Sequence, residues 1–515
     1  MNAFEDKKVS VILHYSDKLP YGDQGFATVV ETVEKQRPKP VDIIILKQEK
    51  DSEIKADIDN MKTVKDFETI SQGLKKAVEK ADGEFVIYID NQQYEVLLKQ
   101  SYLETALMTV ERSSELGMLY ADYELESDGE VQEQHLLKHH IGRVRDNQDY
   151  GSVLFFPKEA LKNAIDTSVK FKPLYDIRLK VSENYNLVHI SNRYDGSLYR
   201  VIAPATEENV FDYLMDSEES QKEAEKIVSE HLKRIGAYLE PGDHYRERKV
   251  KDAELTATVV IPVNDRPQFI GTALESVLNQ TVQNIEALVV VNGGDSDPTV
   301  DEVKKYMAGG KKFDSEKPEV RLKVLDVNNI GLCLNMGAQL ARGKYYVQLD
   351  SDDRLKPDAV EKVVEKFESD PEIGMVIGSY EVWELKSSGD YVRMEDIPVV
   401  THDEWTQENG RNNLLRVNGA GAPRCIPFDV IKEVGYFDMN DMPYARNYGE
   451  DYDIVMKISE KYKVGRIFDP IYEVVRHAGG TDHAIDQLTV NRNNEAKDHM
   501  RLKGIKRRIE LNKNN

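Results

Sequence analysis

The feature that most constrains the fold of this chain is an internal repeat, because each copy of a repeat has to form its own structural unit. The first copy opens with an apolar stretch at residues 9–13, an amphipathic helical pattern at residues 26–36 and a second apolar stretch at residues 41–46. The same succession returns in the second half of the chain, at residues 258–263, 269–280 and 285–291. A repeat of this length predicts two domains.

Later blocks of the repeat keep the same order. The run GLKKAVEKADGEFVIYID, which ends at Asp90, resembles the run GLCLNMGAQLARGKYYVQLD, which ends at Asp350. The clearest match joins YDIRLKVSENYNLVHI, which begins at Tyr175, with YDIVMKISEKYKVGRI, which begins at Tyr452. Apolar strands that alternate with amphipathic helices are typical of βαβ units, which form a mainly parallel sheet. We therefore expect an α/β protein with two tandem, Rossmann-like domains.

Composition sets the expected domain limits. Residues 204–255 are highly charged and contain the helix-like run SEESQKEAEKIVSEHLKRIGAYLEP, which predicts a helical linker. The first domain is then expected at residues 1–203 and the second at residues 256–495. Residues 496–515 form a basic tail, for which a solvated helix is a simpler interpretation than contact with a membrane surface.

The formal net charge of −23 argues against nucleic-acid binding, which requires a basic face that displaces counterions from phosphates. No run approaches the ~20 apolar residues of a transmembrane helix, and the first residues lack the apolar core of a signal peptide. We expect a cytoplasmic protein whose membrane contact is at most peripheral, at the inner face. The two cysteines, Cys333 and Cys425, are expected to be inert thiols and not a disulfide framework.

Several Asp-x-Asp triplets occur in the chain, so their context has to separate them. Asp350-Ser351-Asp352 follows the buried-strand pattern KYYVQL, which predicts that its carboxylates lie at the carboxyl end of a strand, where open α/β sheets bind ligands. Two carboxylates one residue apart offer hard oxygen ligands to Mn²⁺ or Mg²⁺ and leave positions open for phosphate oxygens. The alternative is that these aspartates only cap the helix expected near Pro357.

Four blocks of the second half resemble, in this order, family 2 glycosyltransferases of the GT-A fold: VVIPVNDRPQFIGTALESVLNQT, IEALVVVNGGDSD, NNIGLCLNMGAQLARGKYYVQLDSDD and YGEDYDIVMKISEKY. The resemblance covers residues 256–480. It implies transfer of a sugar from a nucleotide diphosphate sugar to a hydroxyl acceptor, with inversion at the anomeric carbon. The first half then resembles a degenerate copy of the same fold.

The resemblance also implies which residues bind the donor. The positions that match the donor-binding loops of the family are Pro262, Asn264, Asp265, Asp297, Gly331, Asp350 and Ser351. The metal ligands, for Mn²⁺ or Mg²⁺, are matched by Asp350, Asp352 and His477, and Arg476 beside the histidine is an alternative contact for phosphate. The second loop has Asn292-Gly293-Gly294 where the family commonly has an acidic pair and a glycine, so UDP is only the default nucleotide.

For catalysis, the resemblance points to Glu450 and Asp451, which match the acidic pair of the family's acceptor site. An acceptor hydroxyl must lose its proton as it attacks the anomeric carbon, and Asp451 is the expected general base. The metal ion is expected to stabilise the leaving diphosphate. The alternative interpretation is that both carboxylates only favour the N-terminus of a helix.

The first half lacks the matching chemistry. It has Asp90-Asn91-Gln92-Gln93 in place of Asp350-Ser351-Asp352-Asp353, and Lys172-Pro173-Leu174 in place of Gly449-Glu450-Asp451. One carboxylate is too few to hold a divalent cation in the same way. We therefore expect a non-catalytic first domain that is kept for architecture or for binding an acceptor.

Together these features predict a metal-dependent inverting glycosyltransferase that acts on a saccharide or glycoconjugate acceptor, as in the assembly of bacterial surface polysaccharides. Two alternatives stay open: a two-site polysaccharide polymerase in which both halves are active, and a non-catalytic carbohydrate-binding scaffold. A nucleotidyltransferase is disfavoured, because its basic, glycine-rich first loop is absent after Leu13 and after Val263.

Overall fold

The computed structural model describes residues 4–47, 54, 58–192, 196–203, 217–401, 409–417, 421–439, 448–477 and 486–514 of the 515-residue chain. The chain divides into two compact units, Met1–Ile235 and Gly236–Asn515, which we call the first and the second domain. In the part of the chain that the structure describes, no helix is both long enough and apolar enough to cross a membrane.

The first domain is built on a seven-stranded sheet with the order β10-β6-β9-β4-β1-β2-β3. Its strands are β1 (Val9–Tyr15), β2 (Asp42–Lys47), β3 (Met61–Val64), β4 (Phe85–Ile89), β6 (Leu116–Ala121), β9 (Val153–Pro157) and β10 (Asn186–Ile190). Neighbouring strands are parallel except for β9, which runs antiparallel to β4 and β6. A smaller sheet has the order β5-β11-β7-β8, with β5 (Glu95–Leu98), β7 (Tyr123–Ser127), β8 (Glu130–Gln134) and β11 (Tyr199–Ile202).

The second domain is built on one nine-stranded sheet. Its order is β14-β13-β12-β15-β19-β17-β20-β16, and β18 pairs with β17. The strands are β12 (Leu255–Val263), β13 (Ile285–Val291), β14 (Glu319–Val324), β15 (Gly343–Gln348), β16 (Arg354–Leu355), β17 (Ile373–Leu385), β18 (Tyr391–Arg393), β19 (Arg424–Pro427) and β20 (Lys463–Arg476). Strand β19 runs antiparallel to both of its neighbours, β15 and β17.

The two domains share one strand order. The path β3-β2-β1-β4-β9-β6-β10 of the first domain corresponds, strand by strand, to the path β14-β13-β12-β15-β19-β17-β20 of the second. The one reversed strand holds the same place in each path, as β9 and as β19. The prediction of two tandem α/β domains with mainly parallel sheets is therefore confirmed.

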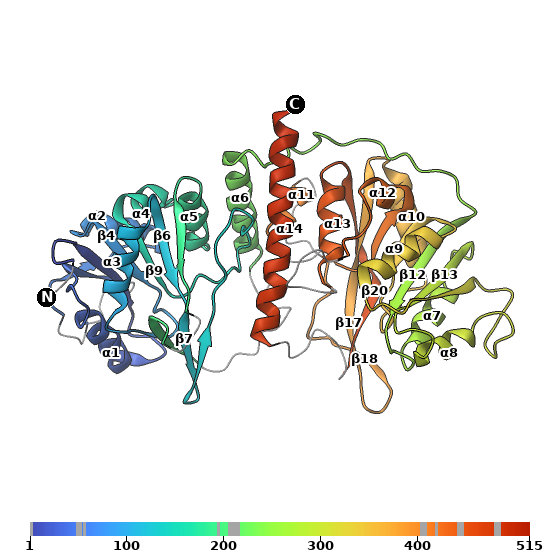
Figure 1. Cartoon of the computed structure of the whole chain (residues 1–515), viewed down its shortest axis with the longest axis horizontal. Helices are drawn as coiled ribbons and strands as arrows, with labels where there is room; N and C mark the ends of the chain where they lie inside the picture. The colour runs from blue at the N-terminus through green and yellow to red at the C-terminus, as the bar shows by residue number, and fades with distance from the viewer. Residues whose placement is uncertain are drawn as a thin grey trace. The chain divides into compact units, whose positions relative to one another are not determined.

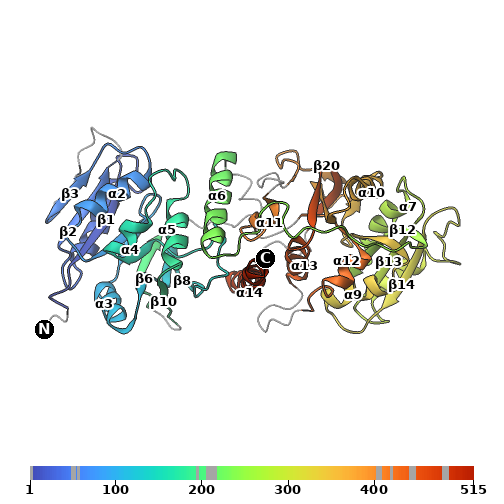
Figure 2. The same ribbon diagram turned by 90° about the horizontal axis from the view of Figure 1, so that it is seen from above.

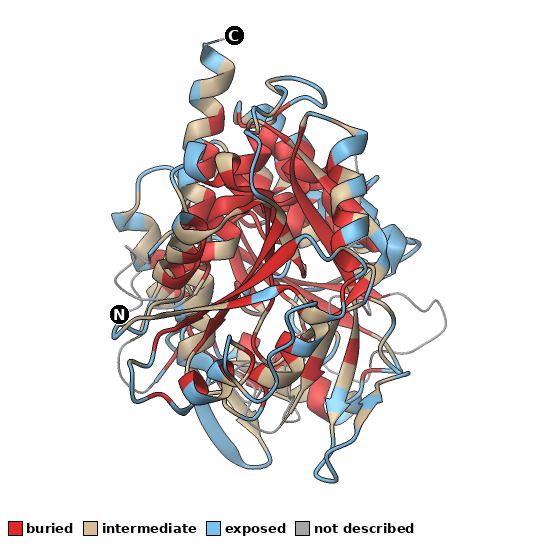
Figure 3. Cartoon of the chain, turned by 90° about the vertical axis from the view of Figure 1, so that its right-hand side faces the viewer, coloured by how far each residue is buried: buried red, intermediate tan, exposed pale blue. Residues whose placement is uncertain are grey.

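Helices cover both faces of each main sheet (Figures 1 and 2). In the first domain, α1 (Gly22–Glu34) and α3 (Tyr102–Arg112) pack on one face, and α2 (Ile70–Lys80), α4 (Lys158–Ala164) and α5 (Pro173–Ser182) pack on the other. In the second, α7 (Ile270–Leu278), α8 (Pro298–Lys304) and α10 (Ala359–Ser369) face α9 (Ile330–Leu340), α12 (Phe428–Glu433) and α13 (Glu450–Ser459) across the sheet. The central strands are consequently buried on both faces and read as continuous apolar runs (Figure 3).

Side chains that join the strands also recur in both domains. Ser10 Oγ accepts a hydrogen bond from the backbone N–H of Gly83 at 2.9 Å, and Thr258 Oγ1 accepts the corresponding bond from Gly343 at 3.0 Å. A Cβ at Gly83 would lie 2.5 Å from a backbone atom of the neighbouring strand, and one at Gly343 would lie 2.3 Å away. Both turns therefore require glycine, which explains why the small-residue turn survives in both copies of the repeat.

The charged helix α6 (Glu218–Arg234) and the C-terminal helix α14 (Gln487–Lys513) correspond to one another. Arg234 Nε of α6 donates a hydrogen bond to Glu183, just after α5, at 2.8 Å. Arg507 Nε of α14 donates to Glu460, just after α13, at 2.9 Å. Each domain thus carries a long helix that is held at the same place, against its last sheet-covering helix.

The domain limits differ from those expected from composition. The first domain ends at residue 235 and not at 203, because α6 packs on α5. Residues 236–255 belong to the second domain, where Leu239 exchanges backbone hydrogen bonds with the Asn412 side chain at 3.0 and 2.8 Å. The expected limit at residue 495 falls inside α14, which begins at Gln487.

Helix α14 is part of the fold and not a solvated tail. Its fully buried residues are Ala496, Asp498, Met500, Arg501, Ile505 and Arg508. Arg501 Nε donates to the carbonyl oxygen of Leu415 at 2.9 Å, and Arg508 Nη2 donates to that of Arg411 at 2.6 Å. The positive charges that suggested a solvated helix therefore satisfy carbonyl oxygens of the short helix α11 (Gly410–Asn413) and the loop after it.

Candidate active site

The candidate site lies at the carboxyl ends of β12, β13 and β15, which are parallel neighbours in the sheet and therefore end at the same edge. The loops that follow these strands carry most of the predicted donor-binding residues. Those residues are Asn264 and Asp265 after β12, Asp297 after β13, and Asp350 and Ser351 after β15, with Pro262 near the end of β12 itself.

Asp297 ties two of these loops together. Its Oδ2 accepts a hydrogen bond from the backbone N–H of Asp265 at 2.9 Å, and its Oδ1 accepts one from Thr299, in the first turn of α8, at 2.8 Å. Asp265 has a positive φ of 50°, and a Cβ at Gly293 would lie 2.3 Å from Asp297 Oδ2. Asp297 therefore shapes the loop after β12, and its contact with a nucleotide stays a prediction.

Gly331 has a packing reason to be glycine. It lies in the first turn of α9, where a Cβ would lie only 2.0 Å from the carbonyl oxygen of Asp438. Asn292, in the loop that lacks the family's acidic pair, is buried, and its Nδ2 donates to Asn328 Oδ1 at 3.2 Å. Neither observation tests donor binding, but together they show that this edge is tightly packed.

The loop after β15 is anchored by β20. Asp353 is 7% exposed, and its Oδ1 accepts a hydrogen bond from the backbone N–H of Val475 at 2.8 Å. The backbone N–H of Asp350 donates to the hydroxyl of Tyr472, on the same strand, at 3.1 Å. The third aspartate of the run is therefore a structural anchor, which leaves Asp352 between two fixed points.

Asp352 and His477 lie together. The His477 Nε2 is 3.1 Å from the Asp352 Oδ2, and the side chain of Asp352 is 27% exposed. The imidazole is held from its other side by the Phe269 ring, with the ring centroids 4.2 Å apart. The structure thus brings two of the three predicted metal ligands into contact.

The donor set around Asp350 fits a divalent cation. Burial raises the pKa of Asp350 in spite of the positive charge of Arg424, and the negative charge of Asp352 adds to the rise. A cation would offset this repulsion, and two carboxylates with one imidazole suit Mn²⁺ or Mg²⁺. Among the described residues, Asp350, Asp352 and His477 do not form a closed set of ligand atoms within 4.8 Å of one another. These three residues supply fewer ligands than Mn²⁺ or Mg²⁺ takes, so further ligands would have to come from phosphate oxygens or water.

The predicted catalytic pair begins α13. Glu450 and Asp451 follow Gly449, which has a φ of 88°. Glu450 is buried, whereas the side chain of Asp451 is 26% exposed. The Asp451 Oδ1 accepts a hydrogen bond from the N–H of Tyr452 at 2.7 Å, and its Oδ2 lies 3.2 Å from Nη1 of Arg424, on β19. The carboxylate is therefore held at both oxygens.

The pKa values of these two carboxyl groups are shifted in opposite directions. Burial opposes ionisation of Asp451, but the positive charges of Arg424 and Lys497 bring its pKa below the ordinary value. Burial, with the negative charge of Asp451, raises the pKa of Glu450 to about 8. These opposite shifts favour ionisation at Asp451 over Glu450, as a general base requires.

The sequence prediction did not single out Arg424, although a signal was present. The run GSVLFFP, which ends at Pro157, corresponds to the run GAPRCIP, which ends at Pro427, and only the second contains an arginine. A comparison of the two copies strand by strand would have marked this position. Tyr472 gave no such signal, because one tyrosine in an apolar strand is unremarkable.

In the first domain, the loop after β4 corresponds to the loop after β15, and hydrogen bonds within the protein hold it in place. Asn91, which follows Asp90, is fully buried; its Oδ1 accepts from the backbone N–H of His14 at 2.8 Å, and its Nδ2 donates to the His14 carbonyl at 2.9 Å. The Tyr21 hydroxyl donates to the carbonyl oxygen of Asn91 at 2.5 Å. These bonds join the end of β4 to the end of β1, where the second domain has its candidate donor loops.

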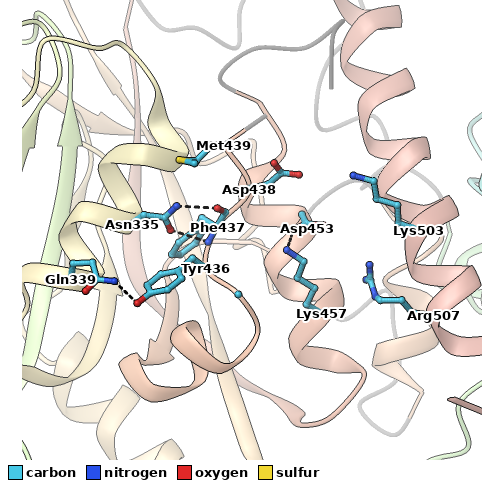
Figure 4. A pocket seen from close by; sticks show the side chains of 11 residues that line it. Asn335, Gln339, Tyr436, Phe437, Asp438, Met439, Asp453, Lys457, Lys503 and Arg507 are labelled. Carbon is cyan, nitrogen blue, oxygen red and sulfur yellow. Dashed lines mark hydrogen bonds and ion pairs between the residues drawn. The ribbon is translucent and has the colours of Figure 1, made fainter. Parts of the chain in front are cut away.

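A cavity of about 480 Å³ lies elsewhere in the second domain, between α9, the loop at residues 435–439, α13 and α14 (Figure 4). Several of its polar side chains already have partners within the protein. Asn335 exchanges hydrogen bonds with the backbone of Phe437, and Lys457 Nζ lies 2.5 Å from Asp453 Oδ2. The cavity therefore adds no residue to the candidate site.

Comparison with known proteins finds similarity to glycosyltransferases in part of the second half. Residues 258–418 match the model of glycosyl transferase family 2. A stretch of 262 residues is 24% identical to a chondroitin synthase of Escherichia coli and covers 50% of this chain and 34% of that protein. A stretch of 200 residues is 30% identical to an uncharacterized glycosyltransferase of Haemophilus influenzae and covers 37% of this chain and 57% of that protein.

The chain thus spans less than two thirds of these relatives. A mannosyltransferase of Pyrobaculum calidifontis, solved with GDP-Man and Mn²⁺, is 13% identical, with 56% of this chain and 82% of that chain covered, but its TM-score of 0.35 is too low to carry an argument. The family match, in contrast, contains the loops after β12, β13 and β15 and the first turn of α9. The second half of this chain therefore contains a region, residues 258–418, that matches glycosyl transferase family 2.

Proposed function

We propose that the second domain transfers a sugar from a nucleotide diphosphate sugar to a hydroxyl of a saccharide or glycoconjugate, with inversion at the anomeric carbon. One observation carries this proposal: the domain with the family match holds a partly exposed Asp451, paired with Arg424, near the partly buried carboxylates of Asp350 and Asp352. A base and a cation-binding group are the two devices that this reaction needs.

Asp350, Asp352 and His477 would hold Mn²⁺ or Mg²⁺, which when bound would stabilise the charge of the leaving diphosphate. Pro262, Asn264, Asp265, Asp297, Gly331 and Ser351 would border the donor, with UDP as the default nucleotide. The acceptor hydroxyl would lose its proton to the carboxylate of Asp451 while its oxygen bonds to the anomeric carbon. The bond from that carbon to the diphosphate breaks on the opposite side, which inverts the configuration.

The role of the whole chain is proposed from its relatives' names. They include the chondroitin synthase above and a hyaluronan synthase of Pasteurella multocida, which is 32% identical over 119 residues, 23% of this chain and 11% of that protein. These names favour polysaccharide assembly. We propose that the first domain is not catalytic, because Asn91 ties its candidate loop to His14 and no acidic pair precedes Tyr175. The cytoplasmic location stays a prediction.

A thermal-shift screen of nucleotide diphosphate sugars, with and without Mn²⁺, tests the proposed donor class, because a specific ligand stabilises the folded state by mass action. We expect one nucleotide to raise the melting temperature only with the metal. Asp451→Asn should keep that shift and lose transfer. Absence of any metal-dependent shift would favour the carbohydrate-binding scaffold, and transfer that survives in a chain without Asp352 would favour a second active site in the first domain.

A further inference from the structure

Arg424 is placed beside the proposed base by the register of the sheet. In the pairing of β15 with β19, Val347 lies opposite Cys425, so the residue before Cys425 sits at the end of β15 that leads to Asp350. From there Arg424 reaches α13, where its Nη1 lies 3.2 Å from the Asp451 Oδ2. The same nitrogen donates to the carbonyl oxygen of Gly421 at 2.6 Å, which gives the guanidinium a second fixed contact.

The first domain supplies an internal comparison for this contact. Its β4 and β9 pair with Ile87 opposite Phe155, so Leu154 holds the place of Arg424. The matched helices that contain Tyr175 and Tyr452 put Leu174 in the place of Asp451. Both leucines belong to one apolar cluster of the first domain. Where the chain lacks the proposed base it also lacks the arginine, and an apolar pair occupies both positions.

This comparison separates stability from chemistry. Replacement of a largely buried ion pair by apolar residues is often neutral or stabilising, because the desolvation of two charges costs as much as their attraction returns. The fold of the first domain is built with leucines at these two positions, so the architecture itself does not require charges there. The ion pair in the second domain therefore calls for a functional explanation.

We propose that Arg424 is a positioning residue for glycosyl transfer, which holds the carboxylate of Asp451 in a fixed orientation. This inference rests on the proposed function, in which Asp451 accepts the proton of the acceptor hydroxyl. With Oδ1 bound by the N–H of Tyr452 and Oδ2 by Arg424, the carboxylate cannot rotate freely. The acceptor proton moves to this carboxylate as the new bond to the anomeric carbon forms, and the electron pair of the broken bond leaves with the diphosphate.

Charged groups face Asp451 from several elements. Arg424 comes from β19, Glu450 from α13 itself, Lys497 from α14 and Asp350 from the loop after β15. Of these, Arg424 is in direct contact with a carboxylate oxygen. Removal of its charge should therefore make Asp451 harder to ionise, and the loss of activity on the acid side of the pH profile should move to higher pH.

The test uses the full chain and the matched variants Arg424→Gln, which removes the charge, and Arg424→Lys, which keeps it. The assay follows Mn²⁺-dependent release of nucleoside diphosphate from UDP-glucose, UDP-galactose, UDP-N-acetylglucosamine, UDP-N-acetylgalactosamine, UDP-glucuronate and GDP-mannose. We expect Arg424→Gln to lower kcat by roughly 100-fold, the lower end for loss of general-base catalysis, with little change in donor KM and with the acid limb moved up. Arg424→Lys should restore the pH profile.

A double variant, Arg424→Leu with Asp451→Leu, copies the first domain and tests whether the pair is structural. We expect it to keep the melting temperature of the wild type and to be inactive. An unfolded double variant, or an Arg424→Gln variant with wild-type kcat and pH profile, would overturn the proposal. If the wild-type chain itself releases no diphosphate from any donor, the proposed function fails, and the inference fails with it for that separate reason.

Discussion

The Nε2 of His477 lies 3.1 Å from the Oδ2 of Asp352, and this contact joins the end of β20 to the loop after β15. Next to it, Asp353 accepts a hydrogen bond from the N–H of Val475, near the end of β20, whereas Asp352 contacts His477, just after that strand. The partly exposed carboxylate of Asp352 can meet a ligand, whereas the buried carboxylate of Asp353 fixes the loop. Single substitutions at Asp352 and at Asp353 can therefore test the two roles independently.

Asp352→Ala should abolish the metal-dependent binding of donor and should leave the melting temperature of the unliganded protein unchanged, because its side chain is 27% exposed. His477→Ala should weaken donor binding by roughly 10- to 100-fold, as expected for loss of a group that supports a metal site. Calorimetry with Mn²⁺ and the donor found by the screen measures both. Asp301→Ala on α8, whose side chain is 84% exposed, is the matched control. If the Asp352→Ala variant bound donor and metal as the wild type does, Asp352 would not be a metal ligand.

Asp353 should behave in the opposite way. Asp353→Ala leaves the N–H of Val475 without its partner in a buried place, which should cost about 1–3 kcal/mol of unfolding free energy. Asp353→Asn keeps an oxygen that accepts the bond and should recover most of that loss. Urea unfolding measures the stability of the two variants. If Asp353→Ala were as stable as the wild type, Asp353 would not anchor the loop.

We expect the buried Glu286 to make the free energy of unfolding depend on pH. It is fully buried, and burial opposes its ionisation, but hydrogen bonds from Thr258, Arg321 and Arg342 bring its pKa below the ordinary value. A lowered pKa stabilises the folded state above the unfolded-state pKa of about 4.3, and this contribution is lost as the pH falls through the folded-state pKa. Glu286→Gln should therefore lower the unfolding free energy more at pH 7 than at pH 4. Glu316→Gln, at an exposed position, serves as the control, and equal losses at both pH values would contradict the prediction.

Gly331 and Gly504 form a matched pair of helical glycines. Gly331→Ala puts a Cβ 2.0 Å from the carbonyl oxygen of Asp438 and should cost about 1–3 kcal/mol through overpacking. Gly504→Ala meets its nearest atom at 3.6 Å and should stabilise α14 by up to about 1 kcal/mol. Thermal unfolding distinguishes the two, and a harmless Gly331→Ala would show that the loop at Asp438 can move.

The whole chain should bind one donor molecule and not two. Asn91 is bound on both sides by the backbone of His14 in the first domain, and only one carboxylate, Asp90, follows β4. Calorimetric titration with donor and Mn²⁺ should give a stoichiometry of one per chain, and Asp352→Ala should remove all of it. A residual site in that variant would make the two-site polymerase the better description.

The repeat could be predicted from sequence because strands and sheet-covering helices have strong local patterns, as in the matched runs that end at Asp90 and Asp350. The place of Asp350 followed from one rule about parallel sheets. The roles of Asp297 and Asp353 did not, because a carboxylate that binds a backbone N–H looks the same in sequence as one that faces a ligand. Arg424 was missed since its contact with Asp451 joins a strand and a helix that lie far apart in the chain.

The fate of α14 was also beyond composition. Arg501 and Arg508 read as charges for solvent, yet each satisfies a carbonyl oxygen in the interior. Such acceptors exist only once α11 and the loop after it have folded into place. The charge of a helix therefore does not predict its exposure when nearby backbone carbonyl groups need hydrogen-bond donors.

The helix pair α6 and α14 changes what counts as one copy of the duplicated unit. Glu183 is only 11% exposed at its side chain, and both His231 and Arg234 of α6 contact it. A first half cut after residue 203 would lose both of these partners and would leave the Glu183 carboxylate without them. Anyone who wishes to study the halves apart should cut the chain after Ile235, since each copy is complete only with the helix that closes it.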